Sequence, residues 1–149
     1  MTRGWFALAL VGVLGGCRAT VQVPFSRAVS LQSVVAADSR STEPRGFWLH
    51  SAEDLRAAGL PLMEADWSQV DVVAVSVGMQ GTTGHRVTME RITLVDDAIV
   101  FDLLHEVPTG PVGEALTFPG VVVQLEKHLE HRRRVVRVGG VVMPCAWKP

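Results

Sequence analysis

Residues 71–77 read Asp-Val-Val-Ala-Val-Ser-Val, and this stretch decides the fold class. Successive side chains of a strand point to opposite faces. Val73, Val75 and Val77 therefore share one face of the expected strand, and the other face carries residues 72, 74 and 76. The stretch predicts a β-strand, and the segments around it determine the rest of the domain.

The strand pattern continues towards the C-terminus. Strands are expected at 86–95, 98–107, 121–126 and 134–138, with a short continuation at 141–143. The alternation of apolar residues changes phase near Glu90-Arg91, which predicts a bulge. Asp96-Asp97 and residues 127–133 are the expected turns. Short strands separated by Gly and Pro turns predict a mostly-β domain, either an antiparallel β-sandwich or an open barrel.

The N-terminal half adds shorter segments. Residues 21–25 alternate like a strand, residues 31–35 form a second apolar run, and residues 47–49 form a short strand. Polar residues with Pro and Gly at 37–46 predict a loop. One short α-helix is expected at 51–61, because Ser51 suits the N-cap, Asp54 the capping-box position and Gly59 the left-handed C-terminal position before Pro61.

The first residues have the pattern of an export signal. Arg3 precedes an apolar run of about ten residues, half of what a transmembrane helix needs. Leu14-Gly15-Gly16-Cys17 resembles the lipobox of bacterial lipoproteins. That resemblance implies a signal peptide at 1–16, acylation of Cys17, a lipidated tether at 17–24 and a single domain at 25–149. In that family an Asp after the cysteine often directs retention in the inner membrane, so Arg18 favours the outer membrane of the cell envelope. The alternative is an ordinary signal peptide with a chance cysteine.

Net charge and cysteine content limit the kinds of partner and covalent bond that we expect for this chain. The chain has 14 basic and 15 acidic residues, a balance that argues against a nucleic-acid partner. If Cys17 is lipidated, Cys145 is the only remaining thiol, so no disulfide forms within the chain. We expect Cys145 to be buried and inert. We also expect no cofactor.

Topology brings two loops together in this prediction. If consecutive strands pair as a meander, the loops 78–85 and 108–120 lie at the same end of the sheet, and the C-terminal tail with Cys145 and Trp147 returns to that end. The first loop carries glycines that permit positive φ and hydroxyls that can face a ligand. The second loop is stiff and poor in charge, and long loops are often functional. The candidate partner-binding residues are Gly81, Thr82, Thr83, Gly84, His85, Pro108, Thr109, Gly110 and Phe118.

His85 is the best single anchor for a partner in this interpretation, because it is planar, amphipathic and flanked by glycine. The alternatives are that the first loop only connects two strands, that His85 caps its turn, and that Phe118 plugs the end of the core.

Patterns for catalysis and metal binding are weak. His128 and His131 are three residues apart, but the arginines at 132–134 would repel a metal ion, so no metal site is expected. We expect those arginines to form a solvated turn, with contact to anionic lipid headgroups as the alternative. His50 and His105 lie near strand ends, facing solvent or a satisfied half-buried site. The sequence has no Gly-x-Ser-x-Gly motif, and we expect no enzyme.

Several short motifs, taken in order, resemble one family. They are Asp66-Trp67-Ser68, the strand Val72–Val75, Gly78, Thr82–Val87, Glu106–Gly110 and Leu116–Pro119. From about Phe47 to Lys127 the chain resembles the C-terminal domain of the protease complex subunit PrcB family. The resemblance implies a non-catalytic, often lipid-anchored accessory subunit that associates with or stabilises an exported protease. Thr83 and His85 depart from the family, which usually has glycine and tyrosine there.

Two further functional classes stay open. Thr82–His85 also resembles the Thr-Thr-Gly-Tyr loop of chagasin-like cysteine-protease inhibitors, so an inhibitor acting through Thr82–His85 and Pro108–Pro119 is the alternative to an accessory protein-binding module. A hydrolase or metal enzyme and a structural envelope protein are the remaining possibilities.

Overall fold

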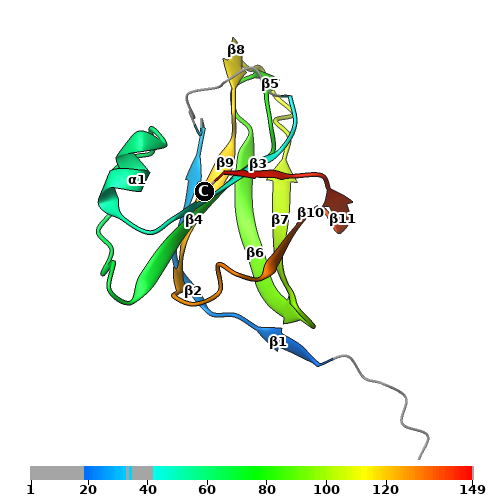
Figure 1. Cartoon of the computed structure of the whole chain (residues 1–149). Helices are drawn as coiled ribbons and strands as arrows, with labels where there is room; N and C mark the ends of the chain where they lie inside the picture. Colours follow the sequence, from blue (N-terminus) through cyan, green and yellow to red (C-terminus); the bar gives the residue numbers. More distant parts are fainter. Residues whose placement is uncertain (1–18, 33, 35–41, 149) are drawn as a thin grey trace, which may run out of the picture.

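The computed structural model describes residues 19–32, 34 and 42–148, which form layered β-sheets with one short helix (Figure 1). The elements in chain order are β1 Thr20–Gln22, β2 Phe25–Leu31, β3 Arg45–Leu49, α1 Ala52–Ala57, β4 Val70–Ser76, β5 Gln80–Thr82, β6 Arg86–Val95, β7 Ala98–Glu106, β8 Glu114–Thr117, β9 Gly120–Glu126, β10 Arg133–Val138, β11 Val141–Met143 and β12 Ala146–Lys148. The expected signal peptide, Cys17, Arg18 and residues 37–41 of the expected loop lie outside the described residues. None of the helices described is long and apolar enough to cross a membrane.

Two five-stranded sheets form the body of the domain. Sheet A has the order β1-β6-β7-β10-β11, sheet B has the order β12-β3-β4-β9-β2, and a separate two-stranded sheet joins β5 to β8. Both large sheets are open, with two edge strands each. The fold is therefore the predicted mostly-β sandwich and not a barrel.

The strand that decides the fold class lies in the middle of sheet B, between β3 and β9. Val73, Val75 and Val77 belong to the core between the two sheets. Val72 and Ala74 belong to a second apolar cluster, which includes Leu55 of the helix. Both faces of β4 are thus covered, and the alternation predicted from residues 71–77 is confirmed.

Aromatic rings fill the space between the sheets. Trp48 and Phe101 are almost fully buried and meet edge to face, with ring centroids 6.2 Å apart. Trp147 of β12 lies 5.5 Å from Phe101. The C-terminal strand therefore contributes an aromatic side chain to the core between the sheets.

The predicted helix is present, with the predicted cap. The Ser51 hydroxyl accepts a hydrogen bond from the Asp54 N–H at 3.1 Å, and the Asp54 carboxylate accepts one from the His50 N–H at 3.0 Å. Gly59 has a φ of 67°, the left-handed conformation expected after the helix. Leu55 and Leu60 pack the helix and the segment after it onto sheet B.

The predicted meander is wrong. Of the strands β4, β6, β7, β9 and β10, which correspond to the predicted meander, only β6 and β7 pair as consecutive strands. They do so with the expected bulge between Met89 and Arg91 and the expected turn at Asp96-Asp97. The strands β4 and β9 pair with each other in sheet B, whereas β6 and β7 lie in sheet A. The physical reason is that the two connections β4–β6 and β7–β9 cross from one sheet to the other, so each sheet buries an apolar face.

Two further expectations need correction. The folded part begins before residue 25, because Thr20–Gln22 pair with β6 and Val23 is buried in the core. The sandwich is also not purely antiparallel. The strand β10 runs parallel to β7, and β12 runs parallel to β3, because the chain crosses the end of the sandwich before each of them.

Candidate protein-binding arm

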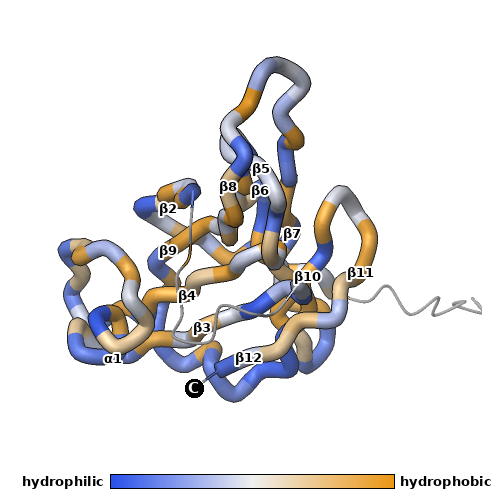
Figure 2. The backbone as a smooth tube through the Cα atoms, turned by 90° about the horizontal axis from the view of Figure 1, so that it is seen from above, coloured by the Kyte–Doolittle hydropathy of each residue, from blue (hydrophilic) through white to orange (hydrophobic). Residues whose placement is uncertain are grey.

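The two loops singled out in the sequence form one projecting unit. The connection β4–β6 contains β5, the connection β7–β9 contains β8, and these strands pair with Gln80 opposite Thr117 and Thr82 opposite Glu114. We call residues 80–84 and 108–117 the arm. Figure 2 shows β5, β8 and the loop beyond them projecting from the two large sheets. The loops lie at the same end of the domain, as predicted, but because of the sheet crossings and not because of a meander.

Hydrogen bonds hold the two halves of the arm together. The Thr83 N–H donates to the Gly113 carbonyl at 2.9 Å, and the Gly113 N–H donates to the Thr83 hydroxyl at 3.0 Å. Nearer the body, the Thr117 hydroxyl donates to the Thr82 carbonyl at 2.8 Å. The threonines that the sequence suggested as ligand-facing groups are therefore used, at least in part, to build the arm.

Gly81 and Gly84, the two glycines in residues 80–84 of the arm, have different environments. Gly84 has a φ of 86°, and a Cβ there would lie 3.3 Å from the Cβ of Pro108. Gly81 has open space around it. Gly84 is therefore needed for both the backbone conformation and the close approach of the Pro108 loop, whereas Gly81 is an exposed position.

His85, which the sequence suggested as the best single anchor for a partner, is buried, with 4% of its surface exposed. Its Nδ1 lies 3.0 Å from His105 Nε2, and its Nε2 lies 2.9 Å from the Thr82 hydroxyl. Its carbonyl accepts a hydrogen bond from the Gln32 side chain at 3.1 Å. All these groups lie at the base of the arm, where His85 joins the arm to the sandwich.

His105, which the sequence placed near a strand end, is the partner that sequence reasoning did not connect with His85. Partial burial, and then the neighbouring His85, lower the pKa of His105 below its ordinary value. The signal was present in the hairpin register, because counting back from the Asp96-Asp97 turn through the bulge places His105 opposite Val87, two residues after His85.

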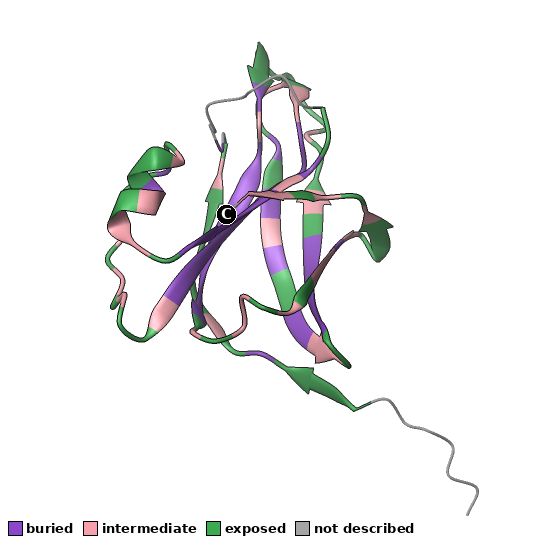
Figure 3. Cartoon of the chain, in the orientation of Figure 1, coloured by how far each residue is buried: buried purple, intermediate pink, exposed green. Residues whose placement is uncertain are grey.

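The outer part of the arm is exposed and almost free of charge. Glu114 is its only charged residue in 80–84 and 108–117. Leu116 is 69% exposed and Val112 39% exposed, and Val107, just before the arm, is 61% exposed. Thr109 and Gly110 are exposed, and Pro108 is half-buried. Figure 3 shows the contrast between the exposed β8 and the buried strands of the body. The arm therefore presents apolar side chains to solvent.

Phe118 lies at the base of the arm rather than on its exposed part. It is half-buried, and its carbonyl accepts a hydrogen bond from the Val34 N–H at 2.7 Å. Of the candidate residues, Gly81, Thr109 and Gly110 are thus well exposed, whereas His85 and Phe118 connect the arm to the body.

Two charged clusters elsewhere connect strands. Asp71 is buried and accepts hydrogen bonds from Trp48 at 2.9 Å, while its other oxygen lies 3.0 Å from His50 Nδ1. Asp102 binds Arg137 through both oxygens and also accepts a hydrogen bond from Arg91 at 3.3 Å. Each cluster satisfies a buried carboxylate, as burial of a charge requires.

The arginines at 132–134 do not form the expected solvated turn. Arg134 lies over the rings of Trp48 and Trp147, with its guanidinium carbon 4.9 and 5.2 Å from the centroids. Arg132 donates to the Asp96 carbonyl, and Arg133 lies 3.9 Å from the Asp97 carboxylate. The three side chains therefore have separate partners, and that of Arg133 stays largely exposed.

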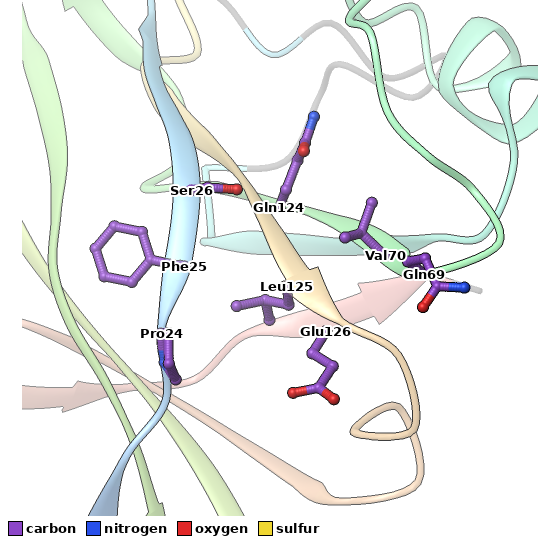
Figure 4. A pocket seen from close by; sticks show the side chains of 8 residues that line it. All are labelled: Pro24, Phe25, Ser26, Gln69, Val70, Gln124, Leu125 and Glu126. Atoms are coloured by element: carbon purple, nitrogen blue, oxygen red, sulfur yellow. The ribbon is translucent and has the colours of Figure 1, made fainter.

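The other hollows and clusters are weaker candidates for a site. An open hollow of about 410 Å³ lies where β2 and β4 begin and β9 ends, away from the arm. Figure 4 shows that the polar ends of Ser26, Gln69, Gln124 and Glu126 point in different directions around it. The described residues include no group of three or more His, Cys, Asp or Glu side chains able to hold a metal ion.

Cys145 is partly buried and lies just before β12. Burial raises the pKa of its thiol to about 12. The side chain is therefore a neutral thiol near pH 7, and thiols react as nucleophiles only when deprotonated.

Comparison with known proteins identifies the segment that contains the arm. The model of the family described as PrcB C-terminal matches residues 72–126, a range that runs from β4 to β9 and contains the whole arm. Neither the curated proteins nor the solved structures that were compared with the chain gave a match. The resemblance to the PrcB C-terminal family found in the sequence is thus confirmed over residues 72–126.

Proposed function

We propose that this chain is a lipid-anchored, non-catalytic accessory subunit that binds an exported protease, or another envelope protein, through its arm. The match of residues 72–126 to the PrcB C-terminal family suggests association with a protease complex. The observation that carries the proposal is the arm itself, since it lies within the family segment and exposes Leu116 and Val112 on an almost uncharged surface.

Exposed apolar side chains support protein binding at the arm. An apolar side chain buried on binding contributes favourable free energy, and a few such anchors provide most of the affinity of an interface. Hydrogen bonds of the Thr83 and Thr117 hydroxyls hold the two halves of the arm together. A preorganised surface loses little conformational entropy on binding, which favours affinity.

The position of β1 supports an anchor at the opposite end. Thr20 pairs with Val95, next to the turn of the β6–β7 hairpin, whereas Arg86 and Glu106 pair at the arm end of the same hairpin. In Figure 1 β1 and β8 accordingly lie at opposite ends of the domain. The ten residues of β6 span about 30 Å. A lipid on Cys17, three residues before Thr20, would leave the arm facing away from the membrane.

The experiment compares two exposed leucines. Leu116 of the arm is 69% exposed, and Leu62, in the segment after the helix, is 75% exposed. We expect Leu116→Ser to reduce co-purification of the native envelope partner at least tenfold, while Leu62→Ser leaves it unchanged. Equal retention of the partner by the two variants would remove the arm from the proposal.

A protease inhibitor is the second candidate function. The specific observation that favours it is the narrow, almost uncharged arm (Figure 2), a shape that can enter a substrate cleft. Turnover of the captured protease separates the two functions. An accessory subunit leaves turnover intact or raises it, whereas an inhibitor lowers it in proportion to the amount bound.

A further inference from the structure

A pair of imidazoles connects the arm to the hairpin of sheet A. His85 directly precedes β6, and His105 lies near the end of β7. Their nearest ring nitrogens, His85 Nδ1 and His105 Nε2, are 3.0 Å apart. The other nitrogen of His85 is 2.9 Å from the hydroxyl of Thr82, the last residue of β5. A continuous path of hydrogen bonds therefore runs from β7 through His85 into the arm.

The hydrogen bond between His85 Nδ1 and His105 Nε2 needs a single hydrogen atom between the two nitrogens. With both rings neutral, one nitrogen donates and the other accepts, and with one ring protonated the imidazolium donates to its neutral neighbour. When both rings are protonated, both facing nitrogens carry hydrogen and both rings are positive. No hydrogen bond then exists between them, and like charges at this distance repel.

The surroundings provide little compensation for a second positive charge. His85 is buried and its ring lies 5.1 Å from that of His105, centroid to centroid. Along β6, β7 and β8 the charged residues nearest the pair are Arg86, Glu106 and Glu114, all exposed. The other charged residues of β6 and β7 are Glu90, Arg91 and Asp102, and Arg91 and Asp102 pair with each other. Glu106 lies 3.9 Å from Arg86, its neighbour across the ladder, and Glu114 lies opposite Thr82 on the arm. Partial burial and the proximity of His85 lower the pKa of His105.

We propose that the His85–His105 pair is an acid-sensitive lock on the arm. The arm is held in its observed position while the pair carries at most one added proton. The second proton breaks the nitrogen–nitrogen hydrogen bond and separates the two rings. Because His85 follows residues 80–84 and His105 precedes residues 108–117, this separation loosens the contact between the two halves of the arm. The lock is a property of the fold, and only its consequence, loss of the partner in acid, rests on the proposed function.

Hydrogen exchange of the purified full chain tests the lock without any partner. Protection factors of the Thr83 and Gly113 amides, corrected for the intrinsic pH dependence of exchange, are measured between pH 7.5 and pH 4.5. We expect them to fall roughly tenfold for each pH unit below the second protonation of the pair, because each proton taken up on opening changes the equilibrium tenfold per unit. Constant protection over this range would overturn the proposal.

Two matched variants test whether His105 causes the pH dependence of amide protection. His105→Gln keeps an N–H that can donate to His85 Nδ1 but does not titrate, so we expect the protection of both amides to change less than twofold with pH. His131→Gln removes an exposed histidine of the 127–133 turn and should respond to pH like the unmodified chain. Acid sensitivity that persists in His105→Gln would contradict the lock.

Ring-nitrogen NMR of the unmodified chain keeps the test valid if His105→Gln does not fold. The lock predicts that the arm amides lose protection at the pH where the second ring of the pair becomes protonated. Protonation of both rings without any change in the arm would contradict it. Because none of these measurements uses a partner, failure of the lock and failure of the proposed function are distinguishable.

Discussion

Thr83 and Gly113, thirty residues apart in the chain, form a reciprocal pair of hydrogen bonds. The Thr83 N–H donates to the Gly113 carbonyl, and the Gly113 N–H donates to the Thr83 hydroxyl. The contact makes one arm from two loops that leave different sheets. A glycine at residue 83 would have no hydroxyl, so Thr83 adds a bond that glycine cannot make.

Thr83→Val should loosen the arm without changing the shape of the side chain. Loss of a hydroxyl that accepts the Gly113 N–H should cost about 1 kcal/mol in the free energy of unfolding. We expect faster hydrogen exchange in residues 108–117, measured by mass spectrometry. Thr109→Val, at an exposed position of the same loop, is the control and should exchange like the unmodified chain.

Gly84→Ala and Gly81→Ala should differ in their effects. Gly84 has a positive φ, which costs about 1–2 kcal/mol for a residue with a Cβ, and its added methyl would contact Pro108 at 3.3 Å. Gly81 has neither constraint, so its substitution should stay within about 0.5 kcal/mol. Urea unfolding followed by circular dichroism measures both. Equal destabilisation by the two substitutions would show that the conformation assigned to Gly84 is wrong.

Cys145 should resist alkylation in the folded chain. Burial raises the pKa of its thiol to about 12, against an ordinary value of 9.0. Each pKa unit changes the thiolate fraction tenfold, so the fraction near neutral pH should fall about a thousandfold. In a chain carrying Cys17→Ser, Cys145 is the only thiol, and iodoacetamide should label it rapidly only after unfolding in guanidinium. Rapid labelling of the folded chain would contradict the assigned burial.

Cys17→Ser should release the protein from the membrane. The Leu14–Cys17 pattern predicts acylation at Cys17, and acyl chains bind bilayers through their buried methylene groups. Metabolic labelling with a fatty acid should mark the unmodified chain and not the serine variant. Unchanged labelling of the variant would place any lipid elsewhere.

Local features of the fold were predictable from the sequence because they depend on neighbouring residues. Alternation in residues 71–77, the cap formed by Ser51 and Asp54, and the phase change at Glu90-Arg91 each appear at the predicted place. In each case the responsible contacts span only a few residues. The sheets were less predictable, because the pairing of β4 with β9 and of β10 with β7 depends on how each sheet buries its apolar face.

The arm, like the sheets, was only partly predictable from the sequence. Sequence reasoning identified both loops and placed them at one end, but it assigned their contact to a meander that does not exist. It also took the glycine-flanked His85 as an anchor for a partner protein, since local composition contains no information about a contact with another strand. Only the register of the β6–β7 hairpin brings His105 near it.

The most direct test of the central claim, protein binding through the arm, is site-specific photo-crosslinking in the native envelope. A crosslinking residue replaces either Val112, exposed on the arm, or Leu62, exposed after the helix, and the adducts are identified by mass spectrometry. We predict one dominant protein adduct from position 112, abolished by Leu116→Ser, and no such adduct from position 62. The same adduct from both positions, or no protein adduct from position 112, would contradict the account.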